Sequence, residues 1–233
     1  MDTRIRHGSV TFVSNNPYTV VLPQGFTPDR AWPLVVALHG MGHSEDLMRR
    51  YMGDLLDRPW IWVFPRGPHP FEMRQPERIR IGNAWYLYTG DQAELRTSME
   101  TATQYLMDLQ DLVRKDFPVS ESIIVGFSQG GYLAGYVAPH HPERFRGGAS
   151  IGGRLKHEFL DDAPETAKKQ VALAQFHGAK DENVAASLAH EAADKCRELG
   201  YGDVEYFEDD EAGHEVSPRL AAALSLWLER LLT

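Results

Sequence analysis

Residues 122–131 have the sequence SIIVGFSQGG, and this stretch decides the fold. Residues 122–127 are mostly apolar with β-branched side chains at their centre, which predicts a buried strand of a parallel sheet. Residues 129–138 then have the apolar spacing of a helix. The sequence therefore predicts a strand, a sharp turn and a helix in direct succession.

The turn between them has the pattern Gly-x-Ser-x-Gly, from Gly126 to Gly130. In α/β-hydrolases a serine at this place sits on a strained strand-to-helix turn that projects its hydroxyl into a cleft. Glycine two residues before and after it avoids collisions with neighbouring elements. Such a short pattern often arises by chance, but its place at the end of a buried strand favours Ser128 as a nucleophile over an incidental serine.

Strand and helix patterns alternate on both sides of this turn. The expected strands are 34–38, 60–64, 122–127, 148–151, 171–176 and 204–207, and the expected helices are 44–56, 92–115, 129–138, 184–199 and 217–231. This alternation predicts an α/β protein with a mostly parallel central sheet flanked by helices, and with the turn at Ser128 it predicts an α/β-hydrolase fold. An N-terminal antiparallel hairpin is expected where residues 9–13 and 18–22 flank Asn15-Asn16-Pro17.

The chain has 233 residues and shows no internal repeat, low-complexity tract or linker. We therefore expect one domain over residues 1–233, without a separate cap domain. One excursion rich in proline and aromatic residues, 66–91, breaks the alternation between a strand and a long helix. Excursions of this length are functional loops or lids, or packed surface loops, and the sequence leaves both interpretations open.

Composition excludes several classes of protein. The formal net charge of −9 argues against non-specific binding to nucleic acid, which needs a basic surface. The single cysteine, Cys196, excludes an intrachain disulfide, and no cysteine and histidine spacing suggests a metal site. No apolar run is long enough to span a membrane, and residues 1–10 lack the apolar core of a signal peptide. We expect a cytoplasmic protein with no stable membrane insertion, and a homodimer is compatible with the sequence.

A base is needed to activate Ser128, because a serine hydroxyl is a weak nucleophile until a neighbour takes its proton. The fold orders its catalytic residues as serine, then aspartate or glutamate, then histidine. Of the histidines after Ser128, only His214 lies between the last expected strand and the last expected helix. His214 is therefore the predicted base.

The acid is expected in the loop after strand 171–176, and Asp181 is our candidate there. Its role would be to orient the imidazole and to stabilise the imidazolium. Aspartate is also favoured at helix starts, so a capping role for Asp181 is the alternative. Glu182 is the nearest rival acid, and the charged run 209–211 is expected to be a solvated loop.

The residues His39-Gly40-Met41-Gly42 follow the first expected buried strand. The fold takes one oxyanion donor from this loop and the other from the residue after the nucleophile. The backbone N–H groups of Met41 and Gln129 are therefore the predicted oxyanion hole, with His39 supporting the loop. An ordinary glycine turn is the alternative interpretation.

Four stretches together resemble the carboxylesterase/phospholipase family, which includes acyl-protein thioesterases and small bacterial carboxylesterases: LHGMG at 38–42, GFSQGG at 126–131, HGAKDENV at 177–184 and GHEV at 213–216. The resemblance covers roughly residues 34–233, and AWY at 84–86 is similar to an aromatic segment of that family. It implies hydrolysis of carboxylic esters or thioesters without a cofactor, and it supports Met41 and Gln129 as oxyanion donors. His43-Ser44-Glu45 replaces the family's Asp-rich turn, and a weaker resemblance is to dienelactone hydrolases, which have cysteine where Ser128 stands.

These observations predict a serine hydrolase that cleaves small-molecule esters with short- to medium-chain acyl groups through a Ser-His-Asp triad and an acyl-enzyme. The candidates for an apolar acyl-binding wall are Met41, Phe71, Trp85, Tyr86 and Tyr88. The alternatives are lysophospholipase or acyl-thioesterase activity, dienelactone-hydrolase-like or peptidase activity, and a non-catalytic binding protein. The last of these predicts a triad or oxyanion hole that lacks a part.

Overall fold

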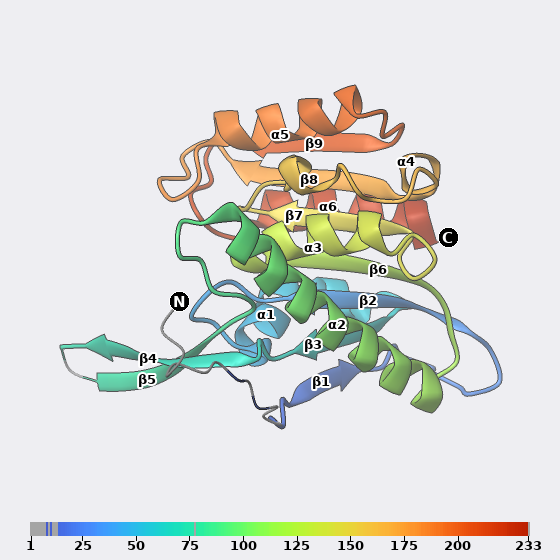
Figure 1. Cartoon of the computed structure of the whole chain (residues 1–233). Helices are drawn as coiled ribbons and strands as arrows, with labels where there is room; N and C mark the ends of the chain where they lie inside the picture. The colour runs from blue at the N-terminus through green and yellow to red at the C-terminus, as the bar shows by residue number, and fades with distance from the viewer. Residues whose placement is uncertain (1–7, 9, 11–13, 77, 233) are drawn as a thin grey trace.

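The computed structural model describes residues 8, 10, 14–76 and 78–232 (Figure 1). Its main element is a seven-stranded sheet with the strand order β1-β3-β2-β6-β7-β8-β9. The strands are β1 (Tyr18–Val21), β2 (Trp32–Leu38), β3 (Ile61–Pro65), β6 (Val119–Phe127), β7 (Gly147–Ile151), β8 (Ala172–Gly178) and β9 (Val204–Asp209). The helices are α1 (Glu45–Met52), α2 (Gln92–Asp116), α3 (Gln129–His140), α4 (Ala167–Gln170), α5 (Ala186–Glu198) and α6 (Pro218–Leu232), with short 3₁₀ turns η1 (Gly53–Asp57) and η2 (His157–Phe159).

Strand pairing confirms the predicted α/β fold with a mostly parallel sheet. From β3 through β2, β6, β7 and β8 to β9 every neighbouring pair is parallel, and only β1 runs antiparallel to its neighbour β3. The expected N-terminal hairpin is described in part: β1 corresponds to its second strand, whereas of its first strand all but Val10 lies outside the described residues.

The core lies on both faces of the sheet, because successive side chains of a strand point to opposite sides. In β2, Leu34 and Val36 pack into one apolar cluster with side chains of α2, α3 and α5. Val35 and Ala37 pack into the other cluster, with side chains of α1 and α6. Figure 1 shows the same layers, with α2 and α3 in front of the sheet and α1 and α6 behind it.

The excursion at 66–91 contains a hairpin that the sequence analysis did not predict. β4 (His69–Gln75) and β5 (Arg78–Ala84) pair antiparallel and extend away from the main sheet (Figure 1). The base of this hairpin packs on the loop after β2, where Asn83 forms a bridge with His43. A Cβ atom at Gly82 would lie 2.7 Å from the Cα atom of Gly42, so close packing fixes this contact. The hairpin therefore braces the loop that carries Met41.

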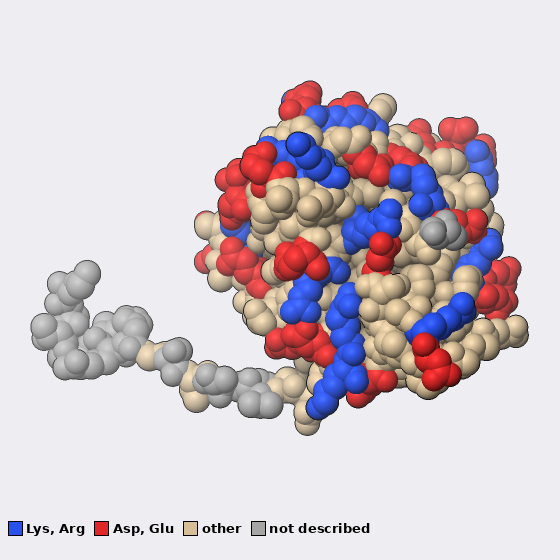
Figure 2. Space-filling model, turned by 90° about the vertical axis from the view of Figure 1, so that its right-hand side faces the viewer, with Lys and Arg blue, Asp and Glu red and all other residues tan. Residues whose placement is uncertain are grey.

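Surface charge and helix character can be described for the same residues. On the face shown in Figure 2, Lys and Arg side chains are interspersed with Asp and Glu side chains and form no continuous basic surface. Within residues 8, 10, 14–76 and 78–232, no helix has the length and apolar character needed to cross a membrane.

Candidate active site

Ser128 lies at the sharp turn between β6 and α3. Its backbone has φ 52° and ψ −118°, and it is the one non-glycine residue with positive φ in the described part of the chain. Such strain persists only where the surroundings hold the backbone in place. Here the Ser128 N–H donates to the Ile151 carbonyl oxygen at 2.8 Å, which ties the turn to the end of β7. The predicted strained turn is therefore present in the structure.

The two glycines of the pattern are required by close backbone contacts. A Cβ atom at Gly126 would lie 2.1 Å from the carbonyl oxygen of Gly130. A Cβ atom at Gly130 would lie 2.6 Å from the carbonyl oxygen of Leu38. Neither backbone oxygen can move without displacing the start of α3 or the end of β2, so no larger residue fits.

We expect Gly126→Ala to lower the free energy of unfolding by about 3 kcal/mol or more, because the added methyl group overpacks a rigid backbone contact. For a chain of this size that corresponds to a fall in Tm of roughly 6–12 °C. Thermal unfolding followed by circular dichroism measures the effect. Gly202→Ala is the matched control, since the nearest atom to its added Cβ is the Lys168 oxygen at 3.8 Å. Equal Tm values for the two variants would contradict the packing argument.

Ser128, His214 and Asp181 form one hydrogen-bonded chain. His214 Nε2 lies 3.0 Å from Ser128 Oγ, and His214 Nδ1 lies 2.8 Å from Asp181 Oδ2. The three residues follow β6, β8 and β9, whose carboxyl ends share one edge of the sheet. With its proton on Nδ1, the imidazole donates to Asp181 and presents the Nε2 lone pair to the Ser128 hydroxyl.

The Asp181 carboxylate contacts His214 and also the turn before α5; it does not cap that helix, whose N-cap residue is Ala185. Oδ2 faces His214, while Oδ1 accepts hydrogen bonds from the backbone N–H groups of Asn183 at 2.8 Å and Val184 at 2.9 Å. Burial raises the pKa of Asp181, but hydrogen bonds from Val184, His214 and Asn183 outweigh it and hold the pKa below its usual value. Asp181 is therefore a carboxylate at neutral pH, and Glu182, its rival, is exposed.

Two further residues position this part of the site, and the sequence analysis assigned a role to neither. The fully buried His177 places Nε2 2.8 Å from the carbonyl oxygen of Val184 and 3.4 Å from Asp181 Oδ2. Asp209 is buried and accepts hydrogen bonds from Ser217 Oγ at 2.6 Å and from Arg219 at 3.1 Å. The expectation that 209–211 is a solvated loop is therefore wrong for Asp209, which fastens the segment carrying His214 to the start of α6.

The predicted oxyanion loop is held from three sides. His39 Nε2 accepts a hydrogen bond from the Gly67 N–H at 2.9 Å, and Trp85 Nε1 donates to the His39 carbonyl oxygen at 2.7 Å. Burial lowers the pKa of His39 to about 4, so its imidazole is neutral and serves as an acceptor. The Gly42 N–H donates to the Asn83 carbonyl oxygen at 2.8 Å.

The N–H groups of Met41 and Gln129 donate to no other group among the described residues. The Gln129 N–H belongs to the first turn of α3, where backbone donors have no partner within the helix. The Gln129 side chain accepts from the Trp85 N–H at 2.9 Å and donates to the Tyr86 carbonyl oxygen at 2.9 Å. It thus ties the start of α3 to the aromatic segment after β5, a role that the sequence analysis did not find.

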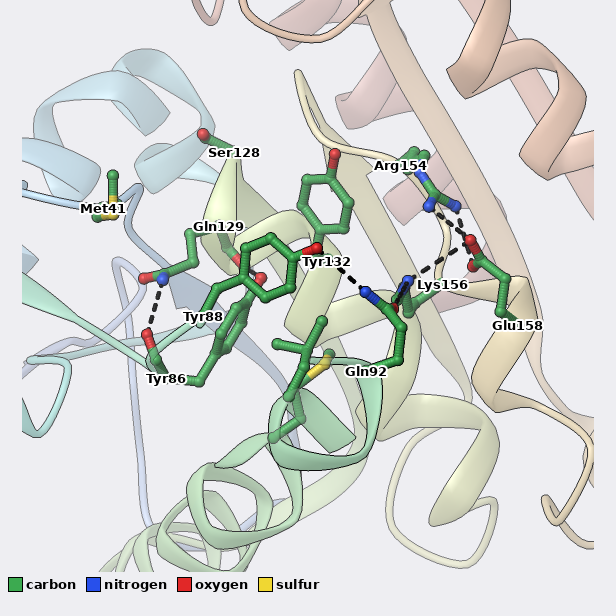
Figure 3. Close-up of a pocket in the computed structure, with 12 residues that line it drawn as sticks. Met41, Tyr86, Tyr88, Gln92, Ser128, Gln129, Tyr132, Arg154, Lys156 and Glu158 are labelled. Atoms are coloured by element: carbon green, nitrogen blue, oxygen red, sulfur yellow. Dashed lines mark hydrogen bonds and ion pairs between the residues drawn. The ribbon is translucent and has the colours of Figure 1, made fainter. Parts of the chain in front are cut away.

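A cavity of about 520 Å³ opens beside Ser128 (Figure 3). Three of the five side chains proposed for the acyl-binding wall line it, namely Met41, Tyr86 and Tyr88. Trp85 is fully buried beneath the oxyanion loop, and Phe71 lies on β4 close to Gly42, so neither lines this cavity. The remaining lining residues are Gln92, Leu95, Met99, Ser128, Gln129, Tyr132, Arg154, Lys156 and Glu158.

The described residues include no cluster of three or more His, Cys, Asp or Glu side chains that could hold a metal ion. The groups gathered at this site are a strained serine, a hydrogen-bonded imidazole, a buried carboxylate and two backbone donors. This set of groups suits acyl transfer through a covalent intermediate.

Several solved structures are similar to this chain. Acyl-protein thioesterase 2 from Zea mays is 18% identical with a TM-score of 0.76, over 94% of this chain and 100% of that chain. Esterase PE8 is 22% identical with a TM-score of 0.72, over 94% of this chain and 100% of that chain. SOBER1 from Arabidopsis thaliana is 21% identical with a TM-score of 0.70, over 86% of this chain and 99% of that chain. At these identities the likeness shows the α/β-hydrolase fold.

The family is shown by the sequence itself. The sequence model of the family described as Phospholipase/Carboxylesterase matches residues 26–231, which is most of the chain. This match confirms the resemblance inferred from the four motifs. The chain belongs to the phospholipase/carboxylesterase family of α/β-hydrolases.

Proposed function

We propose that this protein hydrolyses carboxylic esters with short- to medium-chain acyl groups, with Ser128 as nucleophile, His214 as base and Asp181 as the acid that orients the base. The observation that carries the proposal is the unbroken hydrogen-bonded chain from Asp181 through His214 to Ser128; of these three residues, Ser128 lines the cavity. A non-catalytic binding protein would not need a complete chain of this kind on a strained turn.

In the first step Ser128 Oγ attacks the ester carbonyl carbon while His214 Nε2 takes the hydroxyl proton. The carbonyl π electrons move onto the carbonyl oxygen, which becomes an oxyanion. The N–H groups of Met41 and Gln129 donate to this oxyanion and need no reorganisation, because they have no other acceptor in the described part of the chain. The Asp181 carboxylate stabilises the imidazolium that forms.

The tetrahedral intermediate then collapses, and the bond to the alcohol oxygen breaks. His214 Nε2 gives its proton to the departing alkoxide, so a neutral alcohol leaves and an acyl-Ser128 ester remains. Water repeats the sequence in reverse: it attacks the acyl carbon, gives a proton to His214 and releases the carboxylic acid with a regenerated Ser128 hydroxyl. A thioester follows the same steps with a thiolate as leaving group.

The cavity volume of about 520 Å³ lies in the range of roughly 300–1,000 Å³ common for small-molecule sites. The side chains of Leu95 and Met99 line it with the aromatic rings of Tyr86 and Tyr132. Such a wall favours an acyl chain over a polar group next to the carbonyl. This supports the prediction of short- to medium-chain substrates.

The test is hydrolysis of p-nitrophenyl esters from acetate to palmitate, alongside thioesters with the same acyl groups. We expect kcat/KM to rise from acetate to a medium chain and then to fall, because a longer chain exceeds the cavity. A set of thioesters cleaved faster than every ester would assign the protein to thioester hydrolysis instead. No turnover of any acyl compound in either series would refute the proposal.

A further inference from the structure

Charged side chains gather in the cavity at a distance from the nucleophile. Arg154, Lys156 and Glu158 all lie on the segment that follows β7, and all line the cavity that contains Ser128. Figure 3 shows them on the opposite side of the view from Ser128, with the rings of Tyr132 and Tyr88 between. The cavity therefore has a nucleophile at one end and a charged group of residues at the other.

The charges in this group do not cancel, because two cations face one carboxylate. Arg154 forms a bidentate ion pair with the Glu158 carboxylate, with contacts of 2.5 Å and 3.0 Å to its two oxygens. Such fork-shaped pairs are the strongest arginine–carboxylate contacts. The pair lowers the pKa of Glu158 to about 2 against the opposing effect of its burial, so Glu158 stays ionised. Glu158 thus neutralises Arg154, and the charge of Lys156 remains.

Lys156 shares its carboxylate partner, Glu158, with Arg154. Its side chain is 6% exposed, and its Nζ atom is 3.4 Å from the nearest Glu158 oxygen, longer than a good hydrogen bond. The closer acceptor is the neutral Gln92 Oε1 at 3.1 Å, and the Phe159 ring lies 4.5 Å from Nζ. Burial lowers the pKa of Lys156 because an ammonium without a dedicated counterion is costly in an apolar environment.

A hydrogen-bonded network holds Lys156 in this position. Gln92 accepts from Lys156 and donates through Nε2 to the Tyr88 hydroxyl at 3.1 Å, so the amide is fixed at both ends. The dashed contacts in Figure 3 run from Tyr88 through Gln92 and Lys156 to Glu158 and Arg154. Lys156 is therefore placed at the cavity wall before any ligand arrives, which lowers the entropic cost of binding one.

We infer that the preferred substrates carry an anionic group, a carboxylate or a phosphate, separated by an apolar spacer from the ester cleaved at Ser128, and that Lys156 with Arg154 binds this group. The spacer would lie against Leu95, Met99 and Tyr132, and the anion would give Lys156 a counterion that it does not share with Arg154. A neutral acyl chain of the same length would leave Lys156 with only the Glu158 carboxylate, which Arg154 binds more closely. The inference rests on the proposed function and names the substrate class of that same site.

Matched substrate pairs test it. The first series is mono-p-nitrophenyl esters of linear dicarboxylic acids from succinate to sebacate, each compared with the same compound whose free carboxylate is a methyl ester. The second series places the anion on the alcohol side, with butyrate esters of ω-hydroxy acids and of hydroxyalkyl phosphates against their methylated forms. The readout is the ratio of kcat/KM for the anionic and neutral members.

For the wild-type protein we expect a ratio of about ten or more at the best spacer length, the size of one charge-assisted hydrogen bond. The series in which this ratio is found identifies the side of the ester that carries the anion. Within the second series, the ratios for the hydroxy acid and hydroxyalkyl phosphate esters distinguish a preference for carboxylate from one for phosphate. Lys156→Met should bring the ratio close to one, whereas Glu158→Gln should raise it by removing the competing carboxylate. The ratio is used because general loss of packing lowers both rates together.

Arg146→Met is the matched control, since Arg146 pairs with Glu121 and does not line the cavity. It should leave the ratio unchanged. A wild-type ratio of one or less at every spacer length, with neutral esters still hydrolysed, would overturn this inference and leave the proposed function standing. Opposite shifts in Lys156→Met and Glu158→Gln are required, so unchanged ratios in both variants would also overturn it. No turnover of any ester would refute the proposed function and this inference with it.

Discussion

Ser128→Ala should lower kcat for the best p-nitrophenyl ester by about a million-fold, the loss found when a nucleophile that acts as a unit with its base is removed. The reason is geometric. Ser128 Oγ is the atom 3.0 Å from His214 Nε2, and alanine leaves the imidazole with no proton to take from the protein. Some acceleration over water would remain, because the N–H groups of Met41 and Gln129 still surround the oxyanion position.

The fold should survive this change, since only one oxygen atom is lost and the Ser128 N–H bond to Ile151 stays. Stopped assays of ester hydrolysis measure the loss of activity, and unfolding curves of the wild type and Ser128→Ala compare their stability. Ser120→Ala is the matched control, because Ser120 is exposed near the amino end of the same strand, β6. If Ser128→Ala kept full esterase activity, and Ser120→Ala had the activity and stability of the wild type, another group would be the one that attacks the ester.

Asp181→Asn should lower kcat at neutral pH by roughly ten-thousand-fold while leaving the fold nearly as stable as before. The asparagine carbonyl oxygen can still accept from the N–H groups of Asn183 and Val184, so the turn persists. Its amide NH₂ group then faces His214 Nδ1 and favours the tautomer with the proton on Nε2. In that tautomer the imidazole cannot take the Ser128 proton.

Asp181→Ala separates the two contacts of this carboxylate. It removes the orienting bond to His214 and also the acceptor for the N–H groups of Asn183 and Val184, and loss of these two hydrogen bonds should cost about 1–3 kcal/mol of stability in addition to the loss of activity. Urea unfolding and ester hydrolysis on the three proteins measure both quantities. Glu182→Gln is the control, because Glu182 is exposed and next in sequence. If Asp181→Asn kept wild-type kcat, the role of Asp181 would be limited to holding the turn before α5.

The fold and the family could be predicted from the sequence because their signals are local. A buried parallel strand is a continuous apolar run, and the strained turn after it tolerates only glycine at two positions. The strand predicted at 122–127 is therefore present as β6 (Val119–Phe127), and the expected helix 184–199 as α5 (Ala186–Glu198). Ser128 followed from the Gly-x-Ser-x-Gly pattern at the end of a strand, and Asp181 and His214 from the order of the elements after it; their catalytic roles stay predictions.

Features that depend on tertiary contacts could not be predicted in this way. The alternation of Arg78, Ile79, Arg80 and Ile81 is a strand pattern, but prolines and aromatic residues nearby favoured a loop. Trp85 is apolar and lies in the excursion before the long helix, but its burial depends on how β5 packs against the loop at His39. At the charged end of the cavity, Lys156 from the segment after β7 contacts Gln92 of α2, and no sequence spacing connects these two residues.

The central claim is that Ser128 forms a covalent acyl-enzyme, and the most direct test is labelling with an alkyl fluorophosphonate, which reacts with activated serines. Intact-mass spectrometry and peptide mapping measure where the label goes. We expect one phosphonyl group on the wild-type chain, located on Ser128, with activity lost in proportion to labelling, and no label on Ser128→Ala. Label on a different residue, or an active protein that stays unlabelled, would contradict it.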